Sequence, residues 1–272
     1  MTHRRDQGEP GDFPQGMIWL VGAGPGDPEL LTRKAERLIK AASVIFYDAL
    51  VGPDILALTD PSIRLVPVGK RSGRHSKDQQ SIDRLIVQAA LAGERVVRLK
   101  GGDPAIFGRA AEELNAARHA GVPVRICPGI TAASAAAASL GTSLTLRGFA
   151  RKLTYVTAHA RAGEALTLDW AALADPDATL AVYMGKAAAG EIANSLIAAG
   201  LPSSTPVAMV ENASLPDQLT LRTNLGLLAL AARSALGDGP AILLIGEALR
   251  NPTRGALTAE YSREETATLL AR

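Results

Sequence analysis

The sequence lacks the residues that would build a disulfide framework or a metal centre. Its 272 residues include one cysteine, Cys127, which excludes an intramolecular disulfide and a metal cluster held by cysteines. The four histidines are scattered, without the spacing of metal ligands. No apolar run is long enough to span a membrane, and residues 1–16 lack the apolar core of a signal peptide. We therefore predict a cytoplasmic protein without a metal, with a flexible N-terminus over residues 1–16.

Excess charge of one sign is also lacking. The formal net charge of +2 is too small to indicate a nucleic-acid partner. The apolar share of 47% is normal for a folded globular protein. A chain of this length can bury a sizeable core, either as one large α/β unit or as two smaller domains.

The chain does contain apolar runs that end in glycine. In the segment 95–109 (RVVRLKGGDPAIFGR) an apolar run breaks at two glycines, which are followed by Asp103, a proline and an expected helix start. A buried parallel strand can bring bare backbone and one carboxylate to a ligand in this way. A second segment of the same design, 21–28 (VGAGPGDP), lies near the start of the chain. Together the two segments indicate a small-molecule site built from backbone.

Expected strands and helices alternate along the chain, which predicts the α/β class. The expected strands are 18–21, 43–47, 63–68, 95–99, 122–126, 153–158, 178–184, 206–210 and 241–245, and the expected helices are 28–42, 79–91, 107–120, 130–140, 187–199 and 224–234. The polar segment 143–151 is predicted to link two α/β domains, 17–142 and 152–249, with a tail over 250–272. A ligand is expected between the two domains.

The first glycine loop does not fit a dinucleotide-binding fingerprint. That fingerprint needs its third glycine three positions after the second, whereas Gly22, Gly24 and Gly26 alternate with Ala23 and Pro25. A proline in the loop also removes an N–H donor that would face a pyrophosphate. A nicotinamide cofactor is therefore disfavoured. Taken alone, this loop could equally be only a tight strand-to-helix turn.

Six ordered motifs together carry a family resemblance. They are 21–28 (VGAGPGDP), 47–51 (YDALV), 68–71 (VGKR), 101–103 (GGD), 128–134 (PGITAAS) and 183–185 (YMG). Over residues 17–249 the chain resembles the uroporphyrinogen-III C-methyltransferases of the tetrapyrrole methylase superfamily. The resemblance implies two α/β domains, a homodimer, and S-adenosyl-L-methionine (SAM) in the interdomain cleft. It also implies methyl transfer to carbons 2 and 7 of uroporphyrinogen III, giving S-adenosyl-L-homocysteine and precorrin-2 for sirohaem or cobalamin synthesis.

The resemblance also implies which residues line the cofactor. They are Pro25, Gly101, Gly102, Asp103, Ile106, Thr131, Ala132, Met184 and Ala213. SAM already carries an activated methyl group, so the protein mainly supplies alignment and a dry pocket. The glycines let backbone approach the cofactor, and the aspartate can accept from a ribose hydroxyl or an amine. For Met184 the alternative is a gap-filling core residue, and Ile106 and Ala132 are equally ambiguous by themselves.

The implied substrate carries eight carboxylates, so its pocket should contain cations. Cations near the motifs are Lys70, Arg71, Arg74, Lys77, Arg98, Arg109, Arg147 and Arg151. We predict substrate contacts by Arg71, Arg98, Glu112 and Arg147, of which Arg147 matches a position that the family uses toward its substrate. Glu112 lies three residues after Arg109 and can orient that guanidinium. A solvated basic face is the alternative for these cations.

The predicted catalytic residues are Asp48, Lys70 and Arg109. Methylation of a pyrrole carbon makes a cation-like intermediate, and a proton must then leave the macrocycle. Asp48 follows the expected strand 43–47, where open parallel sheets place functional groups, and an ionised aspartate can accept that proton. Its alternative role is a turn-former. Lys70 is expected to pair with Asp48 or to hold a substrate carboxylate. Arg109 suits anchoring better than proton abstraction, because a guanidinium stays protonated.

Three positions depart from the family pattern. Leu146 stands where a histidine is usual, and Ala158 and Ala213 stand where glycine is usual. Ala213 can offer its backbone to the cofactor only if its φ is negative. Two alternatives stay open: a methylase acting on a later precorrin, and a non-catalytic sensor that binds SAM or a tetrapyrrole. A sensor would not need the charged groups of Asp48 and Lys70.

Overall fold

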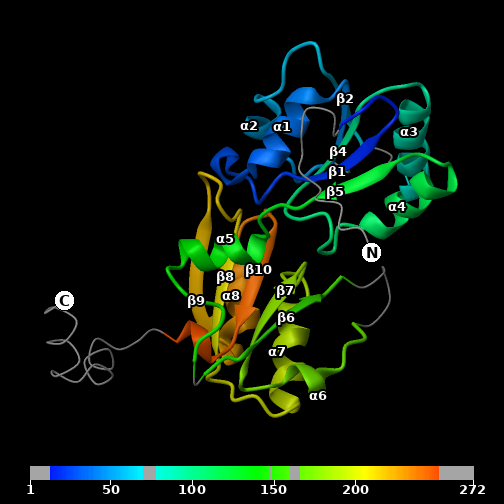
Figure 1. The fold of residues 1–272 in the computed structure, drawn as a ribbon. Coiled ribbons are helices and arrows are strands. Elements are labelled where there is room, and N and C mark those ends of the chain that lie inside the picture. Colours follow the sequence, from blue (N-terminus) through cyan, green and yellow to red (C-terminus); the bar gives the residue numbers. More distant parts are fainter. Residues whose placement is uncertain (1–12, 70–77, 148, 160–165, 251–272) are drawn as a thin grey trace, which may run out of the picture. The chain divides into compact units, whose positions relative to one another are not determined.

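The computed structural model describes residues 13–69, 78–147, 149–159 and 166–250. The chain divides into two compact units (Figure 1). The first unit takes in the chain through Leu140 together with Val210–Leu219 and Asp238–Ile242, and the second unit takes in the remainder. The predicted domain borders at residues 142 and 151 stay a prediction. No helix among the described residues is long and apolar enough to cross a membrane.

The first unit is built on a parallel sheet. Its five strands have the order β3-β2-β4-β1-β5. They are β1 (Ile18–Gly22), β2 (Val44–Tyr47), β3 (Arg64–Pro67), β4 (Val96–Lys100) and β5 (Val124–Cys127). The pairs of β1 with β4 and β5, and of β2 with β3 and β4, are all parallel. Every residue of β1 and β4 is buried, as expected for central strands covered on both faces.

Helices cover both faces of this sheet (Figure 1). They are η1 (Pro28–Leu30), α1 (Arg33–Ala41), α2 (Pro53–Leu56), α3 (Gln79–Leu91) and α4 (Ala110–His119), whereas α5 (Ala132–Ser139) follows β5 and adds no residue to the two cores of this sheet. Alternate residues of β1 enter different cores because side chains along a strand point to opposite faces. Trp19 packs with Ile39 in one core, and Leu20 packs with Ile86 in the other.

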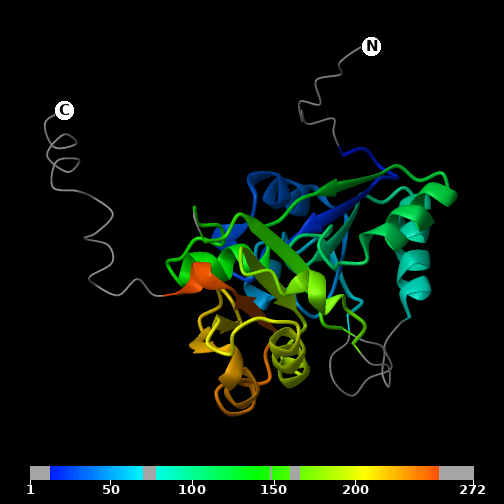
Figure 2. The same cartoon turned by 90° about the horizontal axis from the view of Figure 1, so that it is seen from below.

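A second sheet, whose strands have the order β6-β7-β10-β8-β9, lies mostly in the second unit. The strands are β6 (Lys152–Thr157), β7 (Ala178–Tyr183), β8 (Pro206–Glu211), β9 (Leu219–Asn224) and β10 (Ala241–Ile245). The helices are α6 (Trp170–Leu173), α7 (Ala189–Ala198), η2 (Leu225–Leu227), α8 (Leu228–Ser234) and η3 (Glu247–Leu249). Helices α7 and α8 contact each other, and Figure 2 shows them side by side. Ile192, Leu228 and Leu243 belong to one core.

Two expected helices of the first unit differ in the structure, one by an interruption and the other by a later start. The helix expected over 28–42 is interrupted, because Thr32 takes an extended conformation and caps α1 by accepting the Ala35 N–H. The helix expected over 107–120 begins only at Ala110, because Phe107 and Arg109 have left-handed backbone conformations. Both interruptions lie in segments that follow strand ends, which is where the functional residues are predicted.

Candidate functional site

Glycine backbones join the segments that follow β1, β4 and β5. Because these strands are parallel, their carboxyl ends lie at one edge of the sheet. Gly102 donates its N–H to the Gly24 carbonyl over 2.7 Å, and Gly24 donates in return over 3.2 Å. A Cβ placed on Gly22 would lie 2.6 Å from Gly129 Cα and 2.7 Å from the Gly102 oxygen. We call these four residues, Gly22, Gly24, Gly102 and Gly129, the glycine junction. A side chain on Gly22 or Gly129 would force the segments apart.

The carboxylate of Asp103 ties two of these segments together. Its Oδ1 accepts the Ala105 N–H over 2.7 Å, and its Oδ2 accepts the Gly129 N–H over 3.0 Å. The side chain is half-buried. A carboxylate has about four lone-pair positions, so two acceptor positions remain for a ligand. Asp103 therefore has a structural role beside the predicted cofactor contact.

The two glycines after β4 differ in what surrounds them. A Cβ on Gly101 would lie 2.7 Å from the Leu50 Cβ. Gly102 has a φ of +68°, and a Cβ built on it would meet no atom within 4 Å. Backbone at Gly102 therefore faces open space, whereas Gly101 is packed against the segment after β2.

The remaining predicted cofactor residues of the first unit lie in the same strand-end segments or beside them. Pro25 follows β1, and Ile106 follows the glycine pair after β4. Thr131 caps α5 by accepting the Ser134 N–H over 3.1 Å, and Ala132 is the first residue of that helix. The structure thus brings these residues to segments that share one edge of the first sheet.

Five described residues other than glycine have left-handed backbone conformations. They are Phe107, Arg109, Met184, Asn212 and Ser214, with φ between 51° and 68°. Each follows the end of β4, β7 or β8. Such conformations cost about 1–3 kcal/mol each and concentrate at functional sites. Strain therefore indicates function at these strand ends independently of any family resemblance.

Two predicted cofactor residues lie in or beside this strained backbone. Met184 is 48% exposed, so the alternative of a gap-filling core residue is wrong. Ala213 lies between Asn212 and Ser214 and is absent from the positive-φ residues, which meets the condition set by the sequence. The segment is held within the first unit, because Ser214 Oγ accepts the Asp27 N–H over 3.1 Å.

Asp48 directly follows β2, and both of its oxygens are engaged. Oδ1 accepts the Leu50 N–H over 3.1 Å, which is the turn-forming role that the sequence left open. Oδ2 lies 3.7 Å from the Arg98 Nη2. The side chain is 22% exposed, so it remains partly accessible. A Cβ on Gly69 would lie 2.8 Å from the Asp48 Cα, which places the end of the β3 segment beside Asp48.

Arg109 and Glu112 form a bidentate ion pair. Arg109 Nε and Nη2 donate to the two carboxylate oxygens of Glu112 over 2.8 and 2.7 Å. This confirms that Glu112 orients the guanidinium. The hydrogen bond raises the pKa of Arg109 above its ordinary value and lowers the pKa of Glu112. Arg109 therefore stays protonated and is unsuited to act as a base.

The other predicted cationic residues have different outcomes. Lys70 and Arg71, with Arg74 and Lys77, lie outside the described residues. Arg147 is exposed in a tight turn closed by two hydrogen bonds between Leu146 and Ala150.

Arg98 differs from its prediction. Its side chain is only 4% exposed, and its nitrogens face Glu113, Asp48 and backbone carbonyls. The structure therefore does not support the predicted contact between Arg98 and a substrate. The residues that sequence reasoning missed are Lys100 and Glu113, which are buried beside Arg98. The available signal was a pair of cations at alternate positions in an apolar strand, since buried cations require a carboxylate partner.

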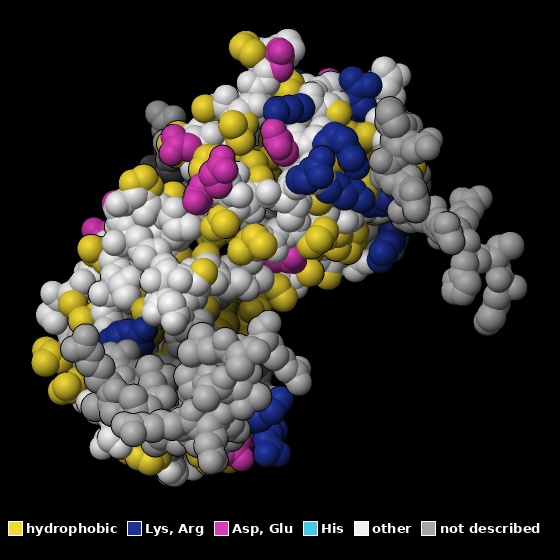
Figure 3. Space-filling model, turned by 60° about the vertical axis from the view of Figure 1, so that its left-hand side comes forward, with side chains coloured by type: hydrophobic (Ala, Val, Ile, Leu, Met, Phe, Trp, Pro, Cys, Tyr) yellow, Lys and Arg dark blue, Asp and Glu magenta, His cyan; other side chains and the backbone are white. Residues whose placement is uncertain are grey.

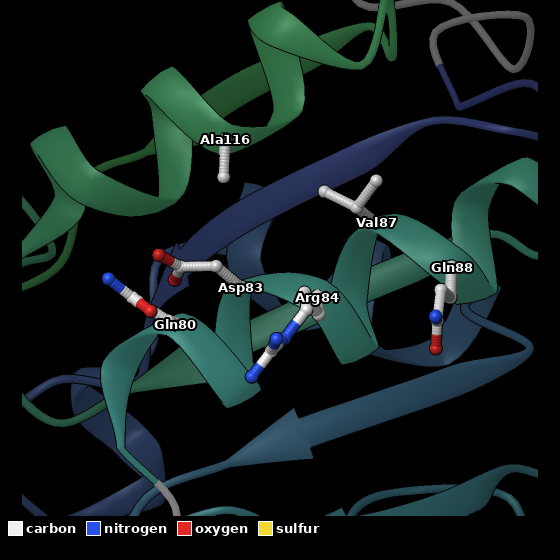
Figure 4. A pocket seen from close by; sticks show the side chains of 6 residues that line it. All are labelled: Gln80, Asp83, Arg84, Val87, Gln88 and Ala116. Atoms are coloured by element: carbon white, nitrogen blue, oxygen red, sulfur yellow. The ribbon is translucent and has the colours of Figure 1, made fainter.

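Two further surface features are a pocket and a gathering of cations. A pocket on α3 and α4 is lined by Gln80, Asp83, Arg84, Val87, Gln88 and Ala116, and Figure 4 shows no predicted site residue among them. Figure 3 shows Lys and Arg side chains gathered on one face of the first unit. Such gatherings are usual on a solvated surface and do not by themselves locate a site.

Comparison with known proteins assigns the chain to a family. Residues 17–229 match the family of Tetrapyrrole (Corrin/Porphyrin) Methylases. The chain is 52% identical over 238 residues to a uroporphyrinogen-III C-methyltransferase of Pseudomonas aeruginosa, covering 87% of this chain and 95% of that one. It is 45% identical over 250 residues to a Paracoccus denitrificans protein of the same name, covering 92% and 87% of the two chains. Several similar siroheme synthases are about twice as long, and the chain spans 49% of one from Yersinia enterocolitica.

A solved structure of a related protein contains the product of a SAM-dependent methyl transfer. It is a Thermus thermophilus uroporphyrin-III C-methyl transferase complexed with S-adenyl homocysteine. The identity is 40% and the TM-score is 0.73, covering 86% of this chain and 99% of that one. The structural likeness therefore extends over both sheets of the chain.

Proposed function

The chain belongs to the tetrapyrrole methylase family, and from that premise we propose that it methylates carbons 2 and 7 of uroporphyrinogen III. Two molecules of SAM are consumed, and the products are precorrin-2 and S-adenosyl-L-homocysteine. The observation that carries the proposal is the 52% identity to the Pseudomonas aeruginosa uroporphyrinogen-III C-methyltransferase over 95% of its length. No segment of that relative large enough to supply a separate activity is left unmatched.

The strand-end backbone of the first unit fits a bound SAM molecule. Gly102 offers open space that a Cβ would fill, and Asp103 keeps acceptor positions for a hydroxyl or amine donor. The cofactor contacts that we propose are Pro25, Gly101, Gly102, Asp103, Ile106, Thr131, Ala132, Met184 and Ala213. SAM supplies a methyl group on a sulfonium, already activated for displacement by a carbon nucleophile. The chain's task is to hold donor and acceptor in line and to exclude water.

Asp48 is the proposed proton acceptor. When a new bond forms between the methyl group and a pyrrole carbon, the macrocycle gains positive charge, and loss of a proton restores its conjugation. The hydrogen bond from Leu50 fixes Oδ1 of Asp48, and Oδ2 is held opposite Arg98. A carboxylate held at a strand end in this way can take the proton without moving. Lys70 is proposed to assist it, and Gly69 brings the preceding segment beside Asp48.

Cations hold the acidic substrate in this proposal. Arg109 keeps its charge because Glu112 raises its pKa, so it can anchor a substrate carboxylate. Arg147 is exposed and free of the interior, and Arg71 lies outside the described residues. Each such contact is a charge-assisted hydrogen bond, which contributes about 1.5–3 kcal/mol to binding. We also propose that the chain forms a homodimer, which light scattering would test.

A sealed incubation tests the reaction itself. The purified chain is mixed under anaerobic conditions with uroporphyrinogen III and SAM labelled in its methyl group. We expect label in a dimethylated product. Label transferred only when a later precorrin replaces uroporphyrinogen III would favour the alternative methylase. SAM binding without transfer to any tetrapyrrole would favour a sensor.

A further inference from the structure

Four charged side chains form a connected group inside the first unit. Arg98 and Lys100 lie on one face of β4, and Glu113 lies on α4. Arg98 Nε donates to Glu113 Oε1 over 2.9 Å. Lys100 Nζ lies 3.0 and 2.9 Å from the two oxygens of Glu113. Glu113 is fully buried, and the side chains of Arg98 and Lys100 are each 4% exposed. Asp48 is the fourth member, and the only one of the four that is substantially exposed.

The guanidinium of Arg98 is held by hydrogen bonds to several partners. Arg98 Nη1 donates to the carbonyls of Phe46 and Leu99 over 3.4 and 2.8 Å. Its Nη2 faces Oδ2 of Asp48 at 3.7 Å. Because a guanidinium is planar, fixing Nε on Glu113 and Nη1 on the two carbonyls determines where Nη2 points. The direction in which it points is toward the proposed proton acceptor.

Stability alone does not account for this arrangement. Replacing a buried ion pair by apolar side chains of similar volume is often neutral or stabilising. Burial and the neighbouring Arg98 lower the pKa of Lys100 below its ordinary value, which shows that the interior disfavours the second cation. Because Arg98 pairs with Glu113 in the interior and with Asp48 at the end of β2, we look for the role of these buried charges at the functional site.

We propose that Arg98 and Glu113 are positioning residues for the methyl-transfer reaction, with Glu113 fixing the guanidinium of Arg98 and Arg98 holding the carboxylate of Asp48. The inference rests on the proposed function. With Leu50 N–H on Oδ1 and Arg98 opposite Oδ2, the carboxylate has one orientation, and its partly exposed edge is left for the substrate. Arg98 acts through Asp48 and does not itself contact the substrate.

A double-mutant cycle tests this inference. Single-turnover rates at saturating SAM and uroporphyrinogen III are measured for wild type, Arg98→Met, Asp48→Asn and the double variant. Glu113→Gln, which keeps the size of the side chain and an acceptor oxygen, is taken through the same cycle. We expect Arg98→Met and Glu113→Gln to lower the rate by about tenfold or more, because small displacements of a reacting group are costly. SAM affinity should stay within about twofold of wild type. In the Asp48→Asn background, each substitution should lower the rate by less than about twofold, because its effect passes through the missing carboxylate.

Other outcomes would overturn the inference. Equal loss in both backgrounds would show general damage to the fold. A raised KM with an unchanged rate would return Arg98 to the predicted substrate contact. A wild-type rate in Asp48→Asn would remove the group that Arg98 is inferred to hold, yet would leave the methyltransferase function standing. Absence of methyl transfer by the wild-type chain would refute the proposed function and the inference with it.

Discussion

Gly102, the second glycine after β4, offers a sharp test of the cofactor site, because the chain contains a matched control. Gly102 and Gly121 have the same φ of +68°, and a Cβ on either would meet no atom within 4 Å. Gly102 follows the carboxyl end of β4, whereas Gly121 follows α4 and precedes β5. Alanine at each position therefore brings the same backbone strain and no protein clash. Only at Gly102 should the new methyl group enter space that we assign to SAM.

The expected magnitudes follow from this geometry. A left-handed conformation costs a residue with a Cβ about 1–2 kcal/mol more than glycine. Both Gly102→Ala and Gly121→Ala should therefore lower the thermal midpoint by about 2–8 °C, at about 2–4 °C per kcal/mol for a chain of this size. Calorimetric titration should find SAM binding weakened by about tenfold or more in Gly102→Ala, which is about 1.4 kcal/mol. Gly121→Ala should bind SAM as wild type does.

Two results would refute this reasoning. Wild-type SAM affinity in Gly102→Ala would mean that the backbone at Gly102 does not approach the cofactor. Equal loss of affinity in both variants would mean that strain, and not local obstruction, governs binding. Gly101→Val would be a poorer probe, because a side chain there collides with Leu50, whose N–H holds Asp48.

Three further predictions concern the substrate, the proton and the buried charge. Arg147→Ala should raise the KM for uroporphyrinogen III by an amount equivalent to about 1.5–3 kcal/mol while calorimetry finds SAM affinity unchanged; an unchanged KM would assign Arg147 to the solvated surface. Asp48→Asn should lower the single-turnover rate by about 10²-fold with SAM binding retained, whereas a normal rate together with a collapse in Arg109→Ala would reverse the assignment. Burial raises the pKa of Asp83, so the folded state holds its proton more tightly, and the unfolding free energy falls as pH rises from about 3.8 through the folded pKa. Asp83→Asn should therefore raise the thermal midpoint at pH 7 and not at pH 3.5, and an equal effect at both values would contradict this.

Much of the fold could be predicted because its signals are local. Helix α3 has the predicted bounds, since Asp78 caps it and Gly93 follows its end. Strand β1 is a continuous apolar run, which is typical of a central parallel strand, and β4 begins with two valines and is equally buried. The first sheet is indeed parallel. Strand β9 was missed because none of its six residues is buried, which leaves little apolar signal.

The late start of α4 could not be read from the sequence. Phe107 and Arg109 adopt left-handed conformations that only glycine adopts freely, and no pattern of residues predicts these conformations. The strain is imposed by surrounding structure: a Cβ on the intervening Gly108 would lie 2.5 Å from the Pro104 carbonyl and 3.2 Å from Lys100 Cε. The turn is therefore packed onto the buried lysine of β4. Such packing between a loop and a strand is known only once the fold has formed.

The difference between the expected and observed surroundings of Arg98 follows from the same distinction between local and tertiary information. The sequence shows a cation beside a ligand-binding motif, and an acidic substrate makes a direct contact the natural hypothesis. What decides its role is Glu113, fifteen residues away and on a different element. Arg109 shows the opposite case, because its partner Glu112 lies three residues away within the same turn of the chain and was predicted. Arg109 stays exposed to solvent, whereas the guanidinium of Arg98 is buried against partners in the interior. Exposure therefore separates the two arginines: we propose that Arg109 meets a substrate carboxylate and that Arg98 acts on the reaction through Asp48.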